Sequence, residues 1–284
     1  MGNRKGQDMK GFKKIGTGIA GLAVVAALAL TGCGGQAPAT QAGSDDATDA
    51  GSYALVADGK LTVGTSAEYE PFEYVEDGAY KGFDLDLITK IAEKLDLTVD
   101  IQNVDFDTIV PGVATGTKYD VGIAAITVTP DRKKEVSFSD SYYIDDQAIV
   151  TMKDSAEITA DNYADALNAG DVKIAVQSGS TAEAFAKENF PEATLVPFKN
   201  ATDCFSALQA GQASALVTNR SVAAQLTADT FDNEQVVKLV STGEEYAIAI
   251  GKDNAALKDA IDDALDELED DGTVDALMEQ YNIK

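Results

Sequence analysis

The chain has 284 residues, 45% of them hydrophobic and 25% charged, so it is long enough for two domains with packed cores. Its 48 acidic residues outnumber the 22 basic ones, and the formal charge of −26 argues against nucleic-acid binding, which needs a basic surface. The absence of histidine excludes Ser-His-Asp and Cys-His nucleophile systems, the common zinc sites and an imidazole general base. No metal site and no cofactor are expected.

Residues 1–32 are typical of an export signal. Basic residues precede an uncharged stretch, Ile15 to Leu30, that is too short for a comfortable bilayer span of about 20 residues. The sequence Leu30-Thr31-Gly32-Cys33 resembles the bacterial lipoprotein box, in which the signal is cut before the cysteine and the thiol is lipidated. We therefore expect lipidation of Cys33. The alternative is an uncleaved membrane anchor with an incidental cysteine.

The segment 33–52 continues from this cysteine with small and polar residues that cannot form a core, and it is interpreted as a flexible linker. With Cys33 lipidated, Cys204 has no partner for an intrachain disulfide. Cys204 lies in an apolar helical register, so a place in the core is a better interpretation than a reactive thiol.

The folded body begins near Tyr53 and alternates strands with helices. Its first part predicts strands and helices in the order strand 60–65, helix 83–95, strand 97–102, helical stretch 106–114 and strand 121–127. After residue 171 the alternation repeats as strand 172–177, helix 181–189, strand 193–196, helix 202–210 and strand 213–217. Strands separated by helices indicate right-handed crossovers and mainly parallel sheets, so the sequence predicts two α/β lobes.

The last segment returns to the pattern of the first lobe. A strand is expected over 246–250, followed by an amphipathic helix over 255–270 with its acidic residues on the solvent face. We therefore predict a discontinuous lobe 1 (53–148 and 246–284) and an inserted lobe 2 (149–245). Such an insertion needs two crossing segments, expected near 148–153 and 242–246, and two crossings make a hinge.

Several motifs follow one another along this body: Val63-Gly64-Thr65, Tyr69-Glu70-Pro71-Phe72-Glu73, Gly82-Phe83-Asp84-Leu85-Asp86-Leu87, Ile126-Thr127-Val128-Thr129-Pro130-Asp131-Arg132 and Val176-Gln177-Ser178-Gly179-Ser180-Thr181. In this order they resemble the bacterial extracellular solute-binding protein family 3, the receptors that feed polar amino acids to ABC importers. The resemblance covers nearly all of residues 60–284.

The resemblance implies a two-lobed, periplasmic-binding-protein-like (type II) fold, with mainly parallel sheets flanked by helices and a two-strand hinge. It also implies a monomeric receptor that captures an amino acid or related small carboxylate by lobe closure and docks on the membrane subunits of an importer. With Cys33 lipidated, this receptor would be anchored to the outer face of the cell membrane, at the cell surface or in the periplasm.

A ligand carboxylate needs charge-assisted donors, ideally a guanidinium that can bind both oxygens. Arg132 follows the end of an expected strand, which is where ligands bind in open α/β sheets. Ser180 and Thr181 open an expected helix, whose N–H groups and hydroxyls can bind an anion, although simple helix capping also explains them. If Arg132 and Thr181 belong to different lobes, one carboxylate bridges the lobes.

The resemblance implies further ligand contacts. Tyr69 and Phe106 stand where related receptors place aromatic or apolar side chains against the ligand, although Phe106 equally suits a core. Thr127 matches a position whose hydroxyl, with the backbone carbonyl near Ala125, accepts from the ligand ammonium. We therefore expect Tyr69, Phe106, Ala125 and Thr127 to contact the ligand, Ala125 through its backbone alone.

Two positions depart from the family pattern, and the first is Ser66, which stands where several members have an aspartate near the ligand. At the second, relatives usually end the strand after Gly211 with an aspartate that pairs with the ligand ammonium, whereas this chain has Asn219. Losing a charge-assisted hydrogen bond costs about 1.5–3 kcal/mol, so α-amino acids should bind more weakly and Asn219→Asp should strengthen their binding. Alternatively, another acid substitutes, the ligand lacks an α-ammonium, or Arg220 participates. The acids that could substitute are Glu68, Glu73, Glu244 and Glu245.

Two further functions stay open. The fold also resembles periplasmic cyclohexadienyl dehydratases, which act on prephenate or arogenate and in which a cleft carboxylate can be a general acid, but no specific catalytic acid is recognisable here. The second is a ligand-sensing module that reports to a membrane receptor. No Gly-rich Walker sequence precedes Lys-Ser or Lys-Thr, so ATP hydrolysis by this chain is not expected. We predict a binding protein with no catalytic residues.

Overall fold

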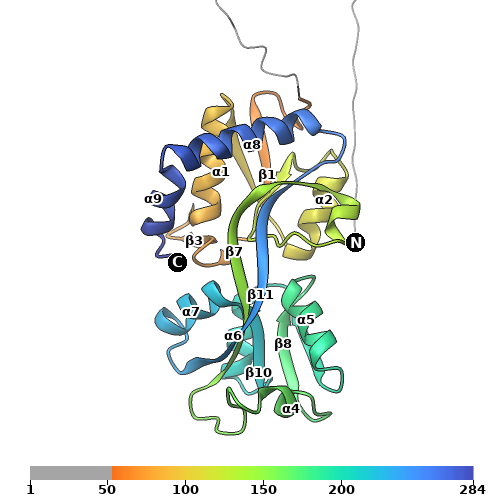
Figure 1. Ribbon diagram of the computed structural model, residues 1–284, viewed down its shortest axis with the longest axis vertical. Coiled ribbons are helices and arrows are strands. Elements are labelled where there is room, and N and C mark those ends of the chain that lie inside the picture. Colours follow the sequence, from red (N-terminus) through yellow and green to blue (C-terminus); the bar gives the residue numbers. More distant parts are fainter. Residues whose placement is uncertain (1–52, 284) are drawn as a thin grey trace, which may run out of the picture. The chain divides into compact units, whose positions relative to one another are not determined.

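The computed structural model describes residues 53–283. The predicted export signal, Cys33 and the linker lie outside these residues. The described part of the chain contains a large mixed sheet with helices packed against it (Figure 1). None of the helices within residues 53–283 has the length and apolar character needed to cross a membrane.

The large sheet has the strand order β5-β1-β6-β11-β7-β10-β8-β9. Its strands are β1 (Lys60–Thr65), β5 (Thr98–Asn103), β6 (Val121–Gly122), β7 (Ser137–Met152), β8 (Lys173–Gln177), β9 (Thr194–Phe198), β10 (Ala215–Asn219) and β11 (Glu234–Ile250). β1 pairs in parallel with β5 and β6, and β8 pairs in parallel with β9 and β10. β7 and β11 are antiparallel to each other and to their outer neighbours, so the sheet is parallel on each side of this central pair.

β7 and β11 connect the two halves of the sheet. Figure 1 shows both strands running from the group around β1 to the group around β8 and β10. Their pairing is irregular between Val240 and Glu244, where they pass from one half to the other. This arrangement confirms the predicted two-lobed α/β fold with a hinge of two crossing strands, although both strands extend well beyond the segments that the sequence indicated. The half with β1, β5 and β6 is called lobe 1, and the half with β8, β9 and β10 is called lobe 2.

Helices flank both halves. Lobe 1 carries α1 (Phe83–Lys94), the 3₁₀ turn η1 (Phe106–Thr108), α2 (Ile109–Ala114), α3 (Arg132–Glu135), α8 (Ala255–Asp270) and α9 (Thr273–Gln280). Lobe 2 carries α4 (Tyr163–Leu167), α5 (Thr181–Asn189), α6 (Ala201–Gln209) and α7 (Arg220–Asp229).

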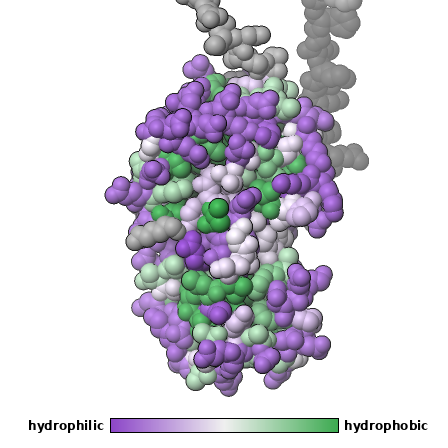
Figure 2. Space-filling view, in the orientation of Figure 1, coloured by the Kyte–Doolittle hydropathy of each residue, from purple (hydrophilic) through white to green (hydrophobic). Residues whose placement is uncertain are grey.

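The amphipathic pattern of α8 explains how this helix packs. Its apolar residues face α1 and belong to one hydrophobic cluster with Leu87, Ile88 and Ile91. Each such burial stabilises the lobe by about 1.5–3 kcal/mol relative to an exposed side chain. The opposite face is acidic, and Figure 2 shows a hydrophilic surface over this helix. The buried residues of α8, all at most 4% exposed, are Leu257, Ile261, Ala264, Leu265 and Leu268.

The strand predicted over 121–127 is shorter than expected. β6 covers only Val121–Gly122, because Ala125 adopts a left-handed conformation with φ of +46° that breaks the ladder. Thr127 returns to the sheet only through a single bridge to Tyr246 of β11. The residues that follow this break enter α3, which begins with Arg132.

The sequence patterns did not predict α3, α4, α7, α9 or a small sheet of β2 (Glu68–Tyr69), β3 (Glu73–Glu76) and β4 (Ala79–Lys81). α7 begins at the residue after β10, with no Gly or Pro to mark the boundary. The small strands have between two and four residues each, too few for an alternating pattern to be recognised. β2 matters most for the site, because it carries Tyr69.

Candidate functional site

Arg132 joins the two lobes. Its Nη1 donates to the main-chain oxygen of Thr127 at 2.7 Å in lobe 1, and its Nη2 donates to the main-chain oxygen of Gly179 at 3.0 Å in lobe 2. The guanidinium carbon lies 5.4 Å from the centre of the Phe106 ring, a cation–π contact. Burial lowers the pKa of Arg132, and the negative charge of Glu244 opposes this shift. The structure thus brings Arg132 and Phe106 together at the boundary between the lobes.

Glu244, which lies in β11, joins the same boundary. One of its carboxylate oxygens, Oε2, accepts a hydrogen bond from Thr127 Oγ1 at 2.7 Å and one from Thr181 Oγ1 at 2.6 Å. The same oxygen accepts from Asn219 Nδ2 at 3.1 Å. Three residues predicted from the sequence as ligand contacts therefore meet on a carboxylate that the sequence could not place.

The other oxygen of Glu244 faces the crossing strands. Oε1 accepts from Gln147 Nε2 in β7 at 2.6 Å and, at 3.4 Å, from Thr242 Oγ1 in β11. Gln147 Nε2 also donates to Thr181 Oγ1 at 3.2 Å. Gln147 was not predicted as a site residue, because it lies inside a strand with no motif of its own.

Tyr69 and Asn219 make a buried contact between the lobes. The Tyr69 hydroxyl donates to Asn219 Oδ1 at 2.8 Å and lies 3.1 Å from Thr218 Oγ1. The two side chains are 8% and 5% exposed. Burial and the loss of hydration raise the pKa of Tyr69, so its hydroxyl stays protonated and available as a donor. The Asn219 amide thus accepts a hydrogen bond from Tyr69 of lobe 1 through Oδ1 and donates one to Glu244 through Nδ2.

Ser180 and Thr181 stand at the start of α5, as predicted, but they make different contacts. The Ser180 hydroxyl accepts from the N–H of Glu183 at 3.1 Å and donates to the oxygen of Gln177 at 2.7 Å, which is N-cap geometry. The Thr181 hydroxyl points instead to Glu244. The capping interpretation therefore describes the contacts of Ser180, and Thr181 is the member of the pair that joins the cluster.

Ala125 is held by a buried carboxylate. Its N–H donates to Asp84 Oδ2 at 2.7 Å, and the same oxygen accepts from the Tyr142 hydroxyl at 2.9 Å. Ala125 is 5% exposed and keeps its positive φ through this bond. Asp84 lies in α1 and Tyr142 in β7, so the backbone near Thr127 is fixed by two other elements of lobe 1.

The structure distinguishes the four acids that were left open as partners of an ammonium group. Glu68 accepts from Thr202 Oγ1 at 3.0 Å, Glu73 is buried beside Asp84, and Glu245 is exposed. Glu244 is the acid in contact with Asn219. The two residues are 25 positions apart in the sequence, and no local sequence pattern predicts their contact.

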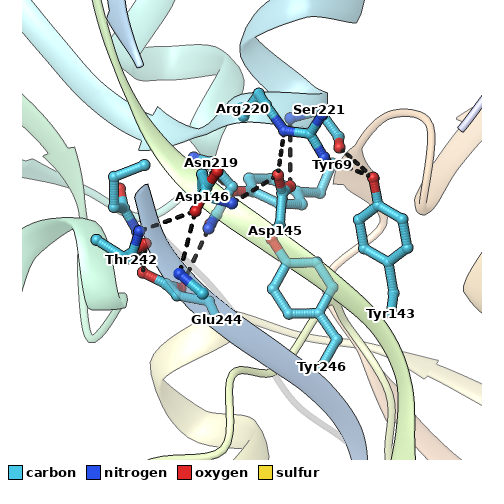
Figure 3. Close-up of polar contacts among 12 residues, drawn as sticks. Tyr69, Tyr143, Asp145, Asp146, Asn219, Arg220, Ser221, Thr242, Glu244 and Tyr246 are labelled. Atoms are coloured by element: carbon cyan, nitrogen blue, oxygen red, sulfur yellow. Dashed lines mark hydrogen bonds and ion pairs between the residues drawn. The ribbon is translucent and has the colours of Figure 1, made fainter. Parts of the chain in front are cut away.

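Arg220, also left open as a ligand contact, is engaged beside the hinge. Its Nε donates to Asp145 Oδ1 at 3.1 Å, and its Nη2 donates to the Tyr143 hydroxyl at 3.0 Å (Figure 3). Asp145 Oδ2 accepts from Ser221 N at the start of α7 and from the Tyr246 hydroxyl, both at 3.2 Å. A carboxylate is favourable at a helix N-terminus, so these bonds fasten α7 to both crossing strands.

A small cavity and an open groove lie beside the contacts between the lobes. A cavity of about 10 Å³, enough for about one water molecule, is lined by residues that include Tyr69, Ser180 and Thr218. An open groove of about 290 Å³ lies beside Glu244 and includes Thr127 and Thr181 in its lining. The second volume is close to the lower end of small-molecule sites, about 300 Å³. The lobes must separate before a ligand can reach Tyr69 and Asn219, because these two side chains are hydrogen-bonded to each other.

Cys204 is 2% exposed in α6, in agreement with the predicted core position, and burial raises the pKa of its thiol to about 12. Such a thiol is not a nucleophile near neutral pH. Among residues 53–283 no cluster of acidic and cysteine side chains has the geometry to hold a metal ion.

Known proteins resemble this chain over most of its length. The profile of the family described as "Bacterial extracellular solute-binding proteins, family 3" matches residues 61–284. The chain is 29% identical to the ABC transporter glutamine-binding protein GlnH of Bacillus subtilis (strain 168), over 93% of this chain and 95% of that protein. It is 30% identical to the arginine-binding extracellular protein ArtP of the same organism, over 89% of this chain and 92% of that protein.

Solved structures agree with these relatives. The ancestral amino acid-binding protein AncCDT-1, a precursor of cyclohexadienyl dehydratase, is 38% identical with a TM-score of 0.73, over 78% of this chain and 95% of that one. An ancestral arginine-binding protein bound to arginine is 37% identical with a TM-score of 0.73, over 78% of this chain and 98% of that one. Because the family profile spans far more than half of the sequence and the fold is the same, the chain belongs to the bacterial extracellular solute-binding proteins, family 3.

Proposed function

We propose that this chain is the substrate-binding subunit of an ABC importer and that it captures an amino acid or a related small carboxylate by closing its two lobes. The observation that carries the proposal is the position of Arg132, whose guanidinium contacts main-chain oxygens of both lobes beside the hydroxyls of Thr127 and Thr181. A carboxylate placed here meets a guanidinium and a hydroxyl from opposite lobes.

In this proposal Arg132 and Thr181 bind the ligand carboxylate, and Ser180 supports them by capping α5. Thr127 and the carbonyl of Ala125 accept from the ligand's amino group, while Tyr69, Phe106 and Asn219 contact the rest of the molecule. The ligand stabilises the closed form because its contacts with both lobes exist together only there, and it shifts the population by that difference in affinity.

The same proposal covers the arrangement in the cell. Residues 1–32 are removed as a signal peptide, Cys33 is lipidated, and 33–52 is the linker to lobe 1 (53–148 and 246–284) and lobe 2 (149–245). The lipid holds a monomer on the outer face of the cell membrane, where the closed form docks on the importer's membrane subunits. Relatives named as binding proteins of ABC transporters support the docking on an importer.

The test is a thermal-shift screen of the purified protein with the twenty amino acids, small carboxylates without an amino group, and small amines. A ligand that binds only the native state raises the melting temperature. At a hundredfold excess over Kd it adds about 2.7 kcal/mol to the free energy of unfolding. We expect shifts from one or a few amino acids and none from the amines. No shift from any carboxylate would contradict the proposal.

A second candidate is an exported dehydratase. The observation that favours it is a buried carboxylate, Glu244, inside a cleft whose solved relatives include a precursor of cyclohexadienyl dehydratase. Incubation with prephenate or arogenate distinguishes the two: turnover supports the enzyme, and its absence together with a thermal shift by an amino acid supports the binding protein.

A further inference from the structure

Glu244 is a buried carboxylate in unusual surroundings. It is 8% exposed, and every hydrogen bond that it accepts comes from a neutral hydroxyl or amide. Within residues 53–283 no Lys or Arg nitrogen lies at ion-pair distance from its oxygens. Neutral donors solvate the charge without cancelling it, so the cleft keeps a negative charge that a cation can still approach.

The nearest opposite charge of the cleft is Arg132, and a single residue separates the two. Thr127 receives the Arg132 guanidinium on its main-chain oxygen at 2.7 Å and offers its own hydroxyl to Glu244 at 2.7 Å. The two charges therefore flank Thr127 without forming an ion pair. A cation and an anion held about one residue apart are complementary to a small zwitterion, whose two charges are also separated by a few bonds.

Asn219 fits this distribution of charge. Its Oδ1 accepts from Tyr69 and its Nδ2 donates to Glu244 at 3.1 Å, which fixes the orientation of the amide. An aspartate at this position would place a second carboxylate against Glu244 and lose that bond. Only one of the two positions 219 and 244 can therefore carry an acid without repulsion. In this chain the acid is Glu244, on the crossing strand β11.

Resting on the proposed function and deepening it, we propose that Glu244 binds the cationic nitrogen of the ligand, so that the ligand is an α-amino acid rather than a carboxylate without an amino group. When the ligand carboxylate takes the hydroxyl of Thr181, that hydroxyl turns away from Glu244 Oε2 and frees an acceptor position. The ligand ammonium fills this position. Thr127 continues to donate to Glu244 and accepts from the ammonium with its own lone pairs.

The experiment measures affinity by titration calorimetry with two matched pairs of probes. L-glutamine and L-arginine are compared with their analogues that lack only the α-amino group, in the wild type and in Glu244→Gln. We expect Glu244→Gln to lose about tenfold to a hundredfold in affinity for the amino acid that binds the wild type, because a charge-assisted bond becomes a neutral one. The affinity for the analogue should stay within about threefold of its wild-type value.

Relocating the acid supplies the second variant. Asn219→Asp combined with Glu244→Gln restores a single acid at the other end of the same hydrogen bond, and we expect it to recover most of the lost affinity. Asn219→Asp alone crowds two acids together and should not strengthen binding, in contrast to the expectation from the sequence alone. Glu188→Gln is the matched control, because it removes one charge from an exposed position of α5 that lines neither the cavity nor the groove, and it should leave all affinities unchanged.

The outcomes separate the two levels of the proposal. If the wild type binds one of the amino acids and Glu244→Gln binds it equally well or more tightly, the role of Glu244 is wrong while the proposed function stands. A tighter complex would mean that Glu244 competes with the ligand for Thr181. If the wild type binds a small carboxylate but none of the twenty amino acids, the role of Glu244 is wrong while the proposed function stands. If it binds no carboxylate at all, the proposed function itself fails. Should Glu244→Gln not fold, the double variant and Glu244→Asp decide, since a retained acid must retain the preference for the amino acid over its analogue.

Discussion

The molecule buries carboxyl groups in two contrasting places. In lobe 1, Glu73 and Asp84 are 1% and 0% exposed, and among the described residues no N–H or hydroxyl donates to Glu73. In the cleft, Glu244 is 8% exposed, and donors from both lobes and both crossing strands surround it. Burial alone therefore does not give an acid its role. The donors around the carboxyl decide whether it is kept for its charge or for its proton.

The pair Glu73 and Asp84 in lobe 1 holds a proton. Burial raises the pKa of Asp84 to about 7, although bonds from Ala125 and Tyr142 oppose the shift. Burial also raises the pKa of Glu73 well above its usual value, and the negative charge of Asp84 adds to this. One proton shared by the two acids satisfies both, and Asp84 then holds the backbone of Ala125.

Arg132→Ala gives the largest expected effect, because it removes the cation that lies across Thr127 from Glu244. We expect a carboxylate ligand to lose about 3 kcal/mol of binding free energy, a hundredfold or more in Kd. Arg132→Lys keeps the charge but not the fork that binds two oxygens, so it should recover only part of the loss. Calorimetry measures both. Unchanged affinity in Arg132→Ala would show that the ligand carboxylate binds elsewhere.

The pH dependence of stability tests the lobe 1 pair. An acid whose pKa is higher in the folded than in the unfolded protein contributes stability at low pH. The contribution is complete below the unfolded-state pKa and is lost as the pH rises through the folded-state pKa. For Asp84 this window runs from about 4 to about 7, and Glu234, whose pKa burial raises to about 8, acts in the same direction. We expect the free energy of unfolding to fall by on the order of 3 kcal/mol between pH 5 and pH 8. A melting temperature that rises over this range would contradict the assignment.

Glu73→Gln provides the matched variant for the pair. An amide can donate to Asp84 without a titrating proton, so the slope of melting temperature against pH should become shallower. Glu245→Gln changes the net charge by the same amount at an exposed position and should leave the slope as it is. A slope that responds equally to both substitutions would mean that general charge repulsion, rather than the buried pair, sets the pH dependence.

Gly179→Ala tests whether the cleft depends on lobe closure. The groups that donate to Glu244 come from both lobes, so they meet only when the lobes are together. A Cβ at Gly179 would lie 2.9 Å from the Cβ of Asp107 in the other lobe, so closure is hindered. We expect about tenfold weaker ligand binding, from an overpacking cost of about 1–3 kcal/mol. Gly211→Ala is the control: its φ of +69° is close to the +73° of Gly179, and no atom lies within 4 Å of the added carbon. Equal affinities in the two variants would contradict the expected effect on closure.

The sequence predicted much of the framework because periodicity and helix ends are local signals. The helices over 181–189 and 255–270 have the predicted bounds, and the two-lobed arrangement followed from their alternation with strands. The ends of the strand over 121–127 could not be predicted, since a positive φ at Ala125 depends on a bond from its own N–H to Asp84, 41 positions away. The motifs placed Arg132, Thr127 and Thr181 near one another, and the structure brings them together.

Glu244 and Gln147 could not be placed by the same reasoning. Glu244 sits in a polar Thr-Gly-Glu-Glu segment that looks like an exposed turn, and its contacts with Thr127 and Gln147 span 117 and 97 positions. Only the crossing of β7 and β11 brings these residues together. The departure at Asn219 was the signal in the sequence that the acid paired with the ligand ammonium was missing, and it indicated the need for a substitute without its position.

Lys199→Ala is expected to have the smallest effect. Lys199 of lobe 2 reaches Asp107 at 2.9 Å and Asp105 at 3.3 Å in lobe 1, so it joins the lobes as Arg132 does, but in water. Exposed ion pairs contribute little and are screened by salt, so ligand affinity should fall by at most about threefold, and the difference should vanish near 0.5 M salt. Lys90→Ala removes a comparable pair inside α1, at 2.8 Å from Glu93, and should leave affinity unchanged. A loss in Lys199→Ala as large as that in Arg132→Ala would mean that rim charges, rather than the buried charges around Thr127, hold the lobes together.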